Sequence, residues 1–299
     1  MHQARPVRRN TRYRAHLPDP SASKSGGAFM EKSFAATGPG RIAYVATGEG
    51  EPILLIHGMP TSSYLWRRVL SLLAPYFSVF AVDLMGFGDS DKPEDADLSI
   101  VAQAQYLGAL MDAVGWESGV VVGHDIGGGI AQLIAINEPT RVSRLVLIDT
   151  IAYDSWPVPE IERLKDPAWD EIIKSLDLTK GFRKALEQGM YHRERVDDEL
   201  VSHYVEPFRD PEGRLAYLRC ARALRTEDLL SVMEDVERLE IPTLIIWGES
   251  DSFQRLEFGE RLQRRMRKAE LIVLSKAGHY TPEDGPEEVA DLIQDFVDR

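Results

Sequence analysis

Cysteine is almost missing from this chain of 299 residues, because Cys220 is the only one. A single cysteine excludes an intrachain disulfide, so we expect a reducing, cytoplasmic environment. Long hydrophobic runs are also missing: no run of 18 or more apolar residues occurs that would predict a transmembrane helix. Basic residues are outnumbered, with 35 lysines and arginines against 48 aspartates and glutamates and a net charge of -13. This acidic balance disfavours nucleic acids and anionic membranes as partners.

The start of the chain differs from the rest in its charge. Residues 1–27 contain six basic side chains and one acidic side chain, so the acidic residues are concentrated downstream. No apolar stretch of the length that a signal peptide needs occurs there. We interpret residues 1–29 as a disordered basic tail. Because the regular pattern begins directly after Met30, we also hypothesise that translation starts at that methionine.

From residue 31 onward, short apolar runs alternate with amphipathic stretches, as in β-strand and α-helix units on a largely parallel sheet. Runs such as ILLI, GVVV and LVLI are almost wholly apolar, which is typical of strands buried on both faces. We expect strands at 32–37, 41–47, 52–56, 78–82, 119–122, 144–148, 243–247 and 271–274. We expect helices at 63–74, 99–114, 128–137, 255–267 and 286–297.

The alternation stops after Thr150 and resumes near Ile241. Residues 151–235, called the insertion below, contain no convincing strand, and their prolines divide them into short helical stretches. We therefore predict an α/β fold with a mostly parallel, eight-stranded sheet flanked by helices. Residues 30–150 and 236–299 form this core, and the helical insertion follows the sixth strand.

The sequence GHDIGG at 123–128 follows an apolar run and opens a helical stretch. It has the pattern of a sharp strand-to-helix turn that exposes a nucleophile, with Asp125 at the nucleophile position. Gly123 and Gly127 would prevent collisions in such a turn. A carboxylate at the start of a helix is favoured in its ionised form and can attack carbon to form an ester. The alternative is that Asp125 only caps the helix.

The sequence HGMP at 57–60 follows another buried strand, and its loop is expected beside Asp125. The backbone N–H groups of Met59 and Ile126 then form a candidate oxyanion hole, which stabilises charge on a tetrahedral intermediate. We interpret His57 as a structural residue that holds this loop.

His279 lies in AGHY, just after the last expected strand, and is the candidate base that activates water. An acidic residue is needed to orient the imidazole and to stabilise its protonated form. Two aspartates follow neighbouring strands: Asp251 in WGESD and Asp149 in IDT. We favour Asp251 and keep Asp149 as the alternative.

These motifs resemble the α/β-hydrolase superfamily from about residue 31 to residue 298. With an aspartate at position 125, the chain resembles the epoxide hydrolase and haloalkane dehalogenase branch of this superfamily. The stretches HGMPTSSYLWR at 57–67 and DLMGFGDSDKP at 83–93 are similar to those of haloalkane dehalogenases. The resemblance implies an α/β-hydrolase fold, in which the insertion is a cap over the pocket. It also implies a small hydrophobic organic substrate that reacts with water, and neither a metal nor an organic cofactor.

The chain departs from the dehalogenases at two positions. They usually have tryptophan after the nucleophile and often asparagine after the HG pair, both of which hold the halide, but this chain has Ile126 and Met59. Trp156 or Trp169 of the insertion would have to supply an N–H group instead. Fluoroacetate dehalogenases carry arginines just after the nucleophile, whereas residues 128–130 here are GGI, which argues against that substrate.

Epoxide hydrolases use tyrosines of the cap to hold the epoxide oxygen, and the insertion offers several, of which Tyr153 and Tyr217 are our first choices. Epoxide opening to a diol is therefore the predicted activity, with Asp125, His279 and Asp251 as catalytic residues. The alternatives are carbon–halogen cleavage, ester or lactone hydrolysis, and a non-catalytic ligand-binding member of this fold. The sequence leaves the oligomeric state open.

Overall fold

The computed structural model describes residues 31–299. The predictions of a disordered tail over residues 1–29 and of a translation start at Met30 fall outside the described residues. The strands are β1 (Ser33–Ala36), β2 (Arg41–Thr47), β3 (Pro52–Ile56), β4 (Ser78–Val82), β5 (Gly119–His124), β6 (Val142–Ile148), β7 (Thr243–Gly248) and β8 (Ala269–Leu274). All eight predicted strands are therefore present.

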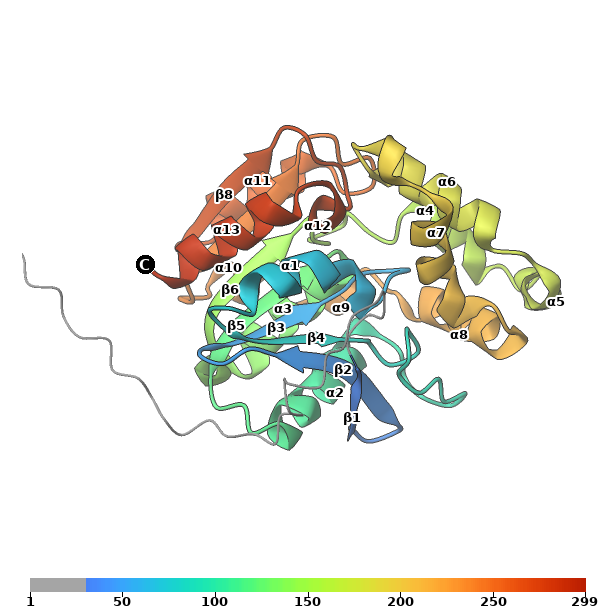
Figure 1. Ribbon diagram of the computed structural model, residues 1–299, viewed down its shortest axis with the longest axis horizontal. Helices are drawn as coiled ribbons and strands as arrows, with labels where there is room; N and C mark the ends of the chain where they lie inside the picture. The colour runs from blue at the N-terminus through green and yellow to red at the C-terminus, as the bar shows by residue number, and fades with distance from the viewer. Residues whose placement is uncertain (1–30) are drawn as a thin grey trace, which may run out of the picture.

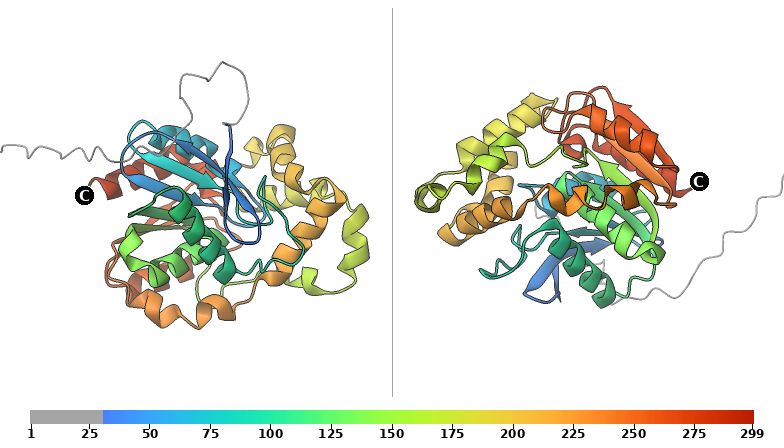
Figure 2. Two further views of the ribbon diagram at one scale, coloured as in Figure 1. Left: turned by 90° about the horizontal axis from the view of Figure 1, so that it is seen from below. Right: turned by 180° about the vertical axis from the view of Figure 1, so that it is seen from behind.

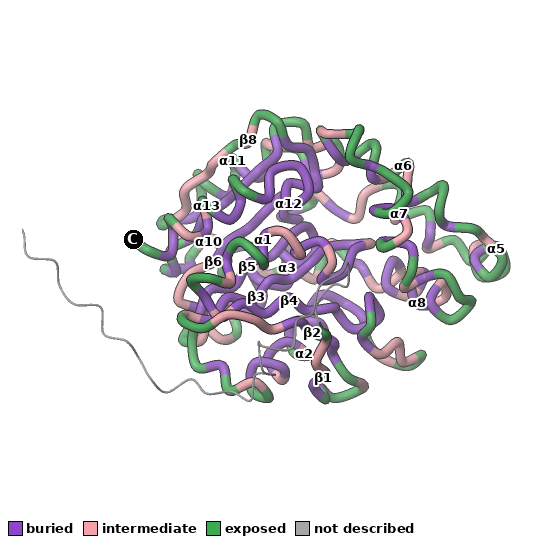
Figure 3. The backbone as a smooth tube through the Cα atoms, viewed as in Figure 1, coloured by how far each residue is buried: buried purple, intermediate pink, exposed green. Residues whose placement is uncertain are grey.

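The eight strands form one sheet in the order β1-β2-β4-β3-β5-β6-β7-β8. β2 pairs antiparallel with β1 and β4, and all other neighbours are parallel. Every residue of β3, β5 and β7 is buried, as their apolar sequences predict (Figure 3). Because parallel strands end at the same edge, the segments that follow β3, β5, β6, β7 and β8 can meet there.

Helices cover both faces of this sheet. α1 packs against α13 in front of the sheet in Figure 1, and α3 contacts α2 and α10 behind it. These helices bury their apolar sides on the sheet, as their sequence periodicity predicts. The core helices are α1 (Arg67–Leu73), α2 (Ile100–Ala113), α3 (Ile126–Asn137), α10 (Met233–Glu237), α11 (Leu256–Arg265), α12 (Thr281–Asp284) and α13 (Pro286–Val297).

The insertion contains helices and no strand, and it projects beyond one edge of the sheet (Figures 1 and 2). Its predicted end at residue 235 falls inside α10, and α10 contacts α3 of the core. Among residues 31–299, no helix is both long and apolar enough to cross a membrane. The helices between β6 and α10 are α4 (Pro159–Glu162), α5 (Trp169–Ser175), α6 (Thr179–Gly189), α7 (Asp198–Val205), α8 (Pro211–Ala223) and α9 (Glu227–Leu230).

Candidate active site

Asp125 stands at the corner between β5 and α3. Its backbone has φ 52° and ψ −121°, a conformation that costs an L-residue about 1–3 kcal/mol. The corner is tight, because a Cβ at Gly123 would lie 2.2 Å from the Gly127 carbonyl oxygen. A Cβ at Gly127 would in turn lie 2.4 Å from the carbonyl oxygen of Ile56. The two glycines thus allow the strand, the turn and the helix to pack closely around Asp125.

The Asp125 carboxylate points at the loop that follows β3. Its Oδ2 accepts a hydrogen bond from the Met59 backbone N–H at 2.9 Å, and the Ile126 N–H, at the start of α3, favours the ionised form of the same carboxylate. Burial raises the pKa of Asp125, while the His279 charge and these two N–H groups oppose that rise. The structure therefore brings both candidate oxyanion donors to the candidate nucleophile.

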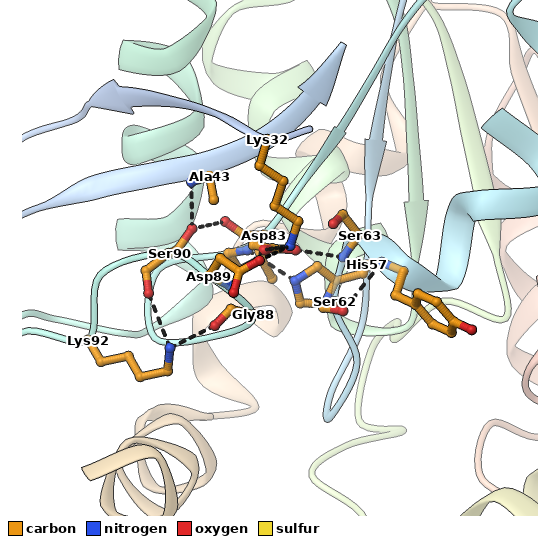
Figure 4. A network of polar contacts seen from close by, with 12 residues as sticks. Lys32, Ala43, His57, Ser62, Ser63, Asp83, Gly88, Asp89, Ser90 and Lys92 are labelled. Carbon is orange, nitrogen blue, oxygen red and sulfur yellow. Dashed lines mark hydrogen bonds and ion pairs between the residues drawn. The ribbon is translucent and has the colours of Figure 1, made fainter. Parts of the chain in front are cut away.

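A buried polar network fixes the loop that carries Met59 (Figure 4). Asp83 accepts hydrogen bonds from the Ser63 N–H at 2.7 Å and from Lys32 Nζ at 2.5 Å. His57 Nε2 accepts from the Leu84 N–H at 3.0 Å, and its Nδ1 lies 2.7 Å from the Gly58 carbonyl oxygen. Burial lowers the pKa of His57 to about 4, so this imidazole is neutral. These contacts agree with a structural role for His57.

His279 follows β8 and is almost fully buried. Its Nδ1 lies 2.9 Å from Asp251 Oδ2, which leaves Nε2 available for a proton from water. Burial disfavours the charged imidazolium, but Asp251, its hydrogen bond and Asp125 outweigh burial and raise the pKa of His279 to about 9. The backbone N–H of His279 donates to the Gly189 carbonyl of the insertion at 2.6 Å.

The two candidate acids occupy different positions. Asp251 Oδ1 accepts from the backbone N–H groups of Phe253 and Gln254, both at 2.8 Å, so its Oδ2 is fixed toward His279. Asp149 Oδ1 accepts from the Gly248 N–H at 2.7 Å. Burial and the Asp251 charge raise the pKa of Asp149 well above its usual value. Asp251 is therefore the carboxylate that contacts the imidazole, and Asp149 does not.

Asp125 and His279 face one cavity of about 320 Å³ between the core and the insertion. Trp156 and Tyr217 also line this cavity, as do the apolar residues Ile151, Ile161, Leu178, Phe182, Leu224 and Phe253. Within residues 31–299, no group of three or more His, Cys, Asp or Glu side chains is arranged to hold a metal ion. The chamber thus combines a carboxylate, an imidazole paired with an acid, and apolar walls.

Tyr153 does not line the cavity, contrary to its place among the predicted leaving-group residues. Its hydroxyl donates to Glu237 Oε1 at 3.1 Å, and the Arg261 guanidinium lies 3.6 Å from the centre of its ring. Its backbone has φ 55°, and its side chain is buried. Tyr153 is therefore a packing residue in this structure.

Two residues of the site were missed by sequence reasoning. Tyr280 lines the cavity directly after His279, and the aromatic residue in AGHY was its only signal. Asp284 accepts three backbone N–H bonds at 2.9 Å, from Gly278 beside His279 and from Tyr191 and His192 in the insertion. No sequence pattern indicated this link, because the residues it joins lie far apart in the chain.

Comparison with known proteins agrees with this geometry. A family model described as the alpha/beta hydrolase fold matches residues 51–173. A soluble epoxide hydrolase from Corynebacterium sp. (strain C12) is 31% identical over 271 residues, covering 86% of this chain and 93% of that protein. A cis-3-alkyl-4-alkyloxetan-2-one decarboxylase from Shewanella oneidensis is 27% identical over 284 residues, covering 90% of this chain and 88% of that protein.

Solved structures show the same likeness. The epoxide hydrolase CorEH, determined without ligand, matches with a TM-score of 0.78 and 28% identity over 89% of this chain and 98% of its own. A loop variant of the haloalkane dehalogenase DbeA from Bradyrhizobium elkanii matches with a TM-score of 0.77 and 26% identity over 89% and 96% of the two chains. The fold, the site and these relatives together establish that the chain is a hydrolase of the α/β-hydrolase superfamily.

Proposed function

We propose that this enzyme opens epoxides to diols through a covalent ester on Asp125. One observation carries the proposal: the Asp125 carboxylate faces the same cavity as the His279–Asp251 pair, while the Met59 N–H binds its Oδ2. A carboxylate in this setting is a nucleophile for carbon, and the paired imidazole is a base for the water that must cleave the ester.

In the first step, the free Asp125 oxygen attacks an epoxide carbon and the C–O bond of the ring breaks. The ring oxygen gains negative charge and needs a hydrogen-bond donor in a chamber with apolar walls. Tyr217 of α8 lines this chamber, and burial raises the pKa of its phenol to about 12, so it stays protonated at neutral pH. We assign the first donor role to Tyr217.

In the second step, His279 Nε2 takes a proton from water, and the oxygen of that water attacks the ester carbonyl carbon. The N–H groups of Met59 and Ile126 stabilise the oxyanion, and such a donor is worth about 2.7–4 kcal/mol. Ester formation removes the Asp125 charge, which is one cause of the raised pKa of His279. Loss of this charge lowers the pKa of His279 and so favours the neutral imidazole, which is the form that can accept a proton from water.

We assign the insertion the role of a cap. Trp156, Leu178 and Leu224 form apolar walls of the cavity opposite the core residues. Such walls limit access of bulk water and strengthen the interaction of the ring oxygen with its donors. The cap residues that line the cavity extend from Ile151, shortly after β6, to Leu224, directly after α8.

Two of the relatives support substrates with a strained C–O ring. One is named an epoxide hydrolase, and another is named as acting on a 3,4-dialkyl oxetan-2-one, a four-membered lactone. Both rings contain an sp³ carbon bonded to oxygen that a carboxylate can attack. A lactone is therefore a second substrate to test with the same nucleophile.

A haloalkane dehalogenase activity is the second candidate function, and Trp156 favours it. The ring of Trp156 lines the cavity, and its buried Nε1 has no hydrogen-bond partner among residues 31–299. An unpaired buried donor is costly and suits a halide. Against this reading, Ile126 and Met59 provide no side-chain donor beside the nucleophile.

The test uses His279→Gln with a panel of terminal epoxides, bromoalkanes and a β-lactone. We expect an epoxide adduct to accumulate on intact protein, because ester formation does not need the base. Peptide mapping should locate the adduct at Asp125, and Asp125→Asn in the same background should abolish it. An adduct from bromoalkanes alone would select the dehalogenase, and wild-type turnover without any adduct at Asp125 would contradict the proposal.

A further inference from the structure

Tyr280 is held rigidly at the wall of the active-site cavity. It follows His279, is 2% exposed, and its ring centre lies 5.3 Å from the imidazole centre at an interplanar angle of 74°. The ring also packs on Gly189 of the insertion, where an added Cβ would lie 2.6 Å from its Cε2. The position of the phenol is therefore determined by packing from both the core and the insertion.

The hydroxyl of Tyr280 differs from those of the other deeply buried tyrosines. Tyr153 donates to Glu237 at 3.1 Å, and Tyr204 donates to Glu283 at 2.7 Å. Within the described part of the chain, the hydroxyls of Tyr280 and Tyr217 make no hydrogen bond to another residue, and both side chains line the cavity. A buried tyrosine usually has such a partner. The two tyrosines that line the cavity are thus the two whose hydroxyls remain available to a ligand.

Both phenols keep their proton at neutral pH. Burial and the charge of Asp125 raise the pKa of Tyr280 above its usual range, and burial raises the pKa of Tyr217 to about 12. Both tyrosines line the same cavity as Asp125 and His279. Tyr217 belongs to α8 of the insertion, whereas Tyr280 belongs to the core loop after β8.

We propose that Tyr280 is a catalytic residue that holds the epoxide oxygen together with Tyr217, one donor coming from the core and the other from the insertion. This inference rests on the proposed epoxide hydrolysis. It replaces the predicted role of Tyr153, whose hydroxyl is bound to Glu237 outside the cavity. The substrate class it selects is an epoxide whose oxygen can sit between the two hydroxyls above Asp125.

The protons balance over one turnover. When Asp125 attacks carbon, the ring oxygen takes a proton from one of the two phenols, which becomes a tyrosinate held by the hydrogen bond of the other. Water then cleaves the ester through His279, which takes the first proton of water and passes it to the product oxygen that leaves the aspartyl carbonyl. The second proton of water, released when the regenerated Asp125 carboxyl ionises, returns to the tyrosinate. The net change is epoxide plus water to diol, with Asp125 ionised and both phenols restored.

The experiment separates ester formation from ester hydrolysis in Tyr280→Phe, Tyr217→Phe and the double variant. Ester formation is followed by intact mass in the His279→Gln background, with styrene oxide and 1,2-epoxyhexane as probes. We expect a loss of about tenfold or more in ester formation for each single variant and about 10²–10⁴-fold for the double variant. Ester hydrolysis, measured by chase in proteins that retain His279, should change by less than about threefold, because the phenols act on the first step.

Tyr191→Phe is the matched control, since Tyr191 lies in the insertion, is 45% exposed and does not line the cavity. Unchanged ester formation in Tyr280→Phe, with normal diol production by the wild type, would overturn the role of Tyr280 and leave the proposed function intact. An equal loss in both steps together with a lower Tm would show a packing role and overturn it as well. No adduct and no diol from either epoxide in the parent proteins would contradict the proposed function itself.

Discussion

Asp125 combines two features that a helix-capping residue alone does not need. It has a positive φ, and its carboxylate is buried with a raised pKa. The pKa of Asp125 is higher in the folded protein than in the unfolded chain. The protonated carboxyl therefore stabilises the fold at low pH, and this contribution is lost as pH rises through the folded pKa. At neutral pH, the ionised carboxylate therefore weakens the fold.

Asp125→Asn tests this feature at the residue scale. The amide keeps the shape and tolerates a positive φ, but it is neutral and is not a nucleophile. We expect activity to fall by at least about 10³-fold and Tm at pH 7 to rise. Thermal unfolding and steady-state kinetics measure both effects, and a variant that is active or less stable than the wild type would contradict this account.

The raised pKa of His279 predicts how stability depends on pH. Its folded pKa of about 9 exceeds the unfolded value of about 6.5. The protonated imidazole therefore stabilises the fold fully below about pH 6.5, and this contribution disappears progressively as pH rises toward and through about 9. We expect the free energy of unfolding, from urea titrations, to fall over this window more steeply for the wild type than for His279→Gln. Parallel curves would show that the imidazole is not charged in the folded protein.

Local sequence patterns were sufficient for some residues of the site and not for others. Asp125 and Asp251 follow the buried strands β5 and β7, and His279 follows the partly exposed β8, so the topology brings all three to one edge. Tyr153 was assigned to the pocket but does not line it, and Tyr280 was given no role but lines it, because the direction of a side chain after a turn depends on φ and on packing. Those determinants, such as φ 55° at Tyr153, are not encoded in a short pattern.

At the scale of elements, Asp284 of α12 joins the loop before His279 to the insertion. Its two carboxylate oxygens accept N–H bonds from Gly278, Tyr191 and His192, each at 2.9 Å. The link acts beside the base and not on the nucleophile. We therefore interpret Asp284 as a positioning residue for the second chemical step.

Asp284→Asn removes acceptor capacity and leaves at least one buried N–H without its partner. We expect a loss of about 1–3 kcal/mol in the free energy of unfolding. Ester hydrolysis should slow by about tenfold, corresponding to about 1.4 kcal/mol, while ester formation stays nearly constant. Asp291→Asn, at an exposed position of α13, is the control. Rapid-quench kinetics that show both steps unchanged would exclude this role.

The positions of the strands and helices were predicted well, because apolar periodicity reflects burial. The ends of the strands were predicted less well, because they depend on backbone pairing with neighbouring strands. β5 extends two residues beyond the predicted Val122, because Gly123 and His124 continue to pair with Leu147 and Ile148 of β6. The expected helix over 63–74 is a short 3₁₀ turn followed by α1. These differences result from contacts between segments and not from local preference.

At the scale of the whole molecule, the cavity lies between the core and the insertion, so both parts determine substrate size. Leu224 at the end of α8 is buried and lines the cavity, which has a volume of about 320 Å³. Leu224→Trp should fill part of this space. We expect kcat/KM for stilbene oxide to fall at least about tenfold relative to 1,2-epoxybutane, because the larger substrate loses room.

Leu230→Trp provides the matched control for this prediction, because Leu230 is 46% exposed and does not line the cavity. Its kcat/KM ratio for the two epoxides should equal that of the wild type. If Leu224→Trp also left the ratio unchanged, the substrate would have to bind outside this cavity.

The central claim is that an oxygen of Asp125 becomes an oxygen of the product. A single turnover with enzyme in excess over epoxide, in water labelled with heavy oxygen, tests it most directly. The account predicts an unlabelled first-turnover diol and one heavy oxygen in the peptide that contains Asp125, because water attacks the carbonyl of the ester. A labelled diol with an unlabelled Asp125 peptide would show direct attack of water on the epoxide and would contradict the account.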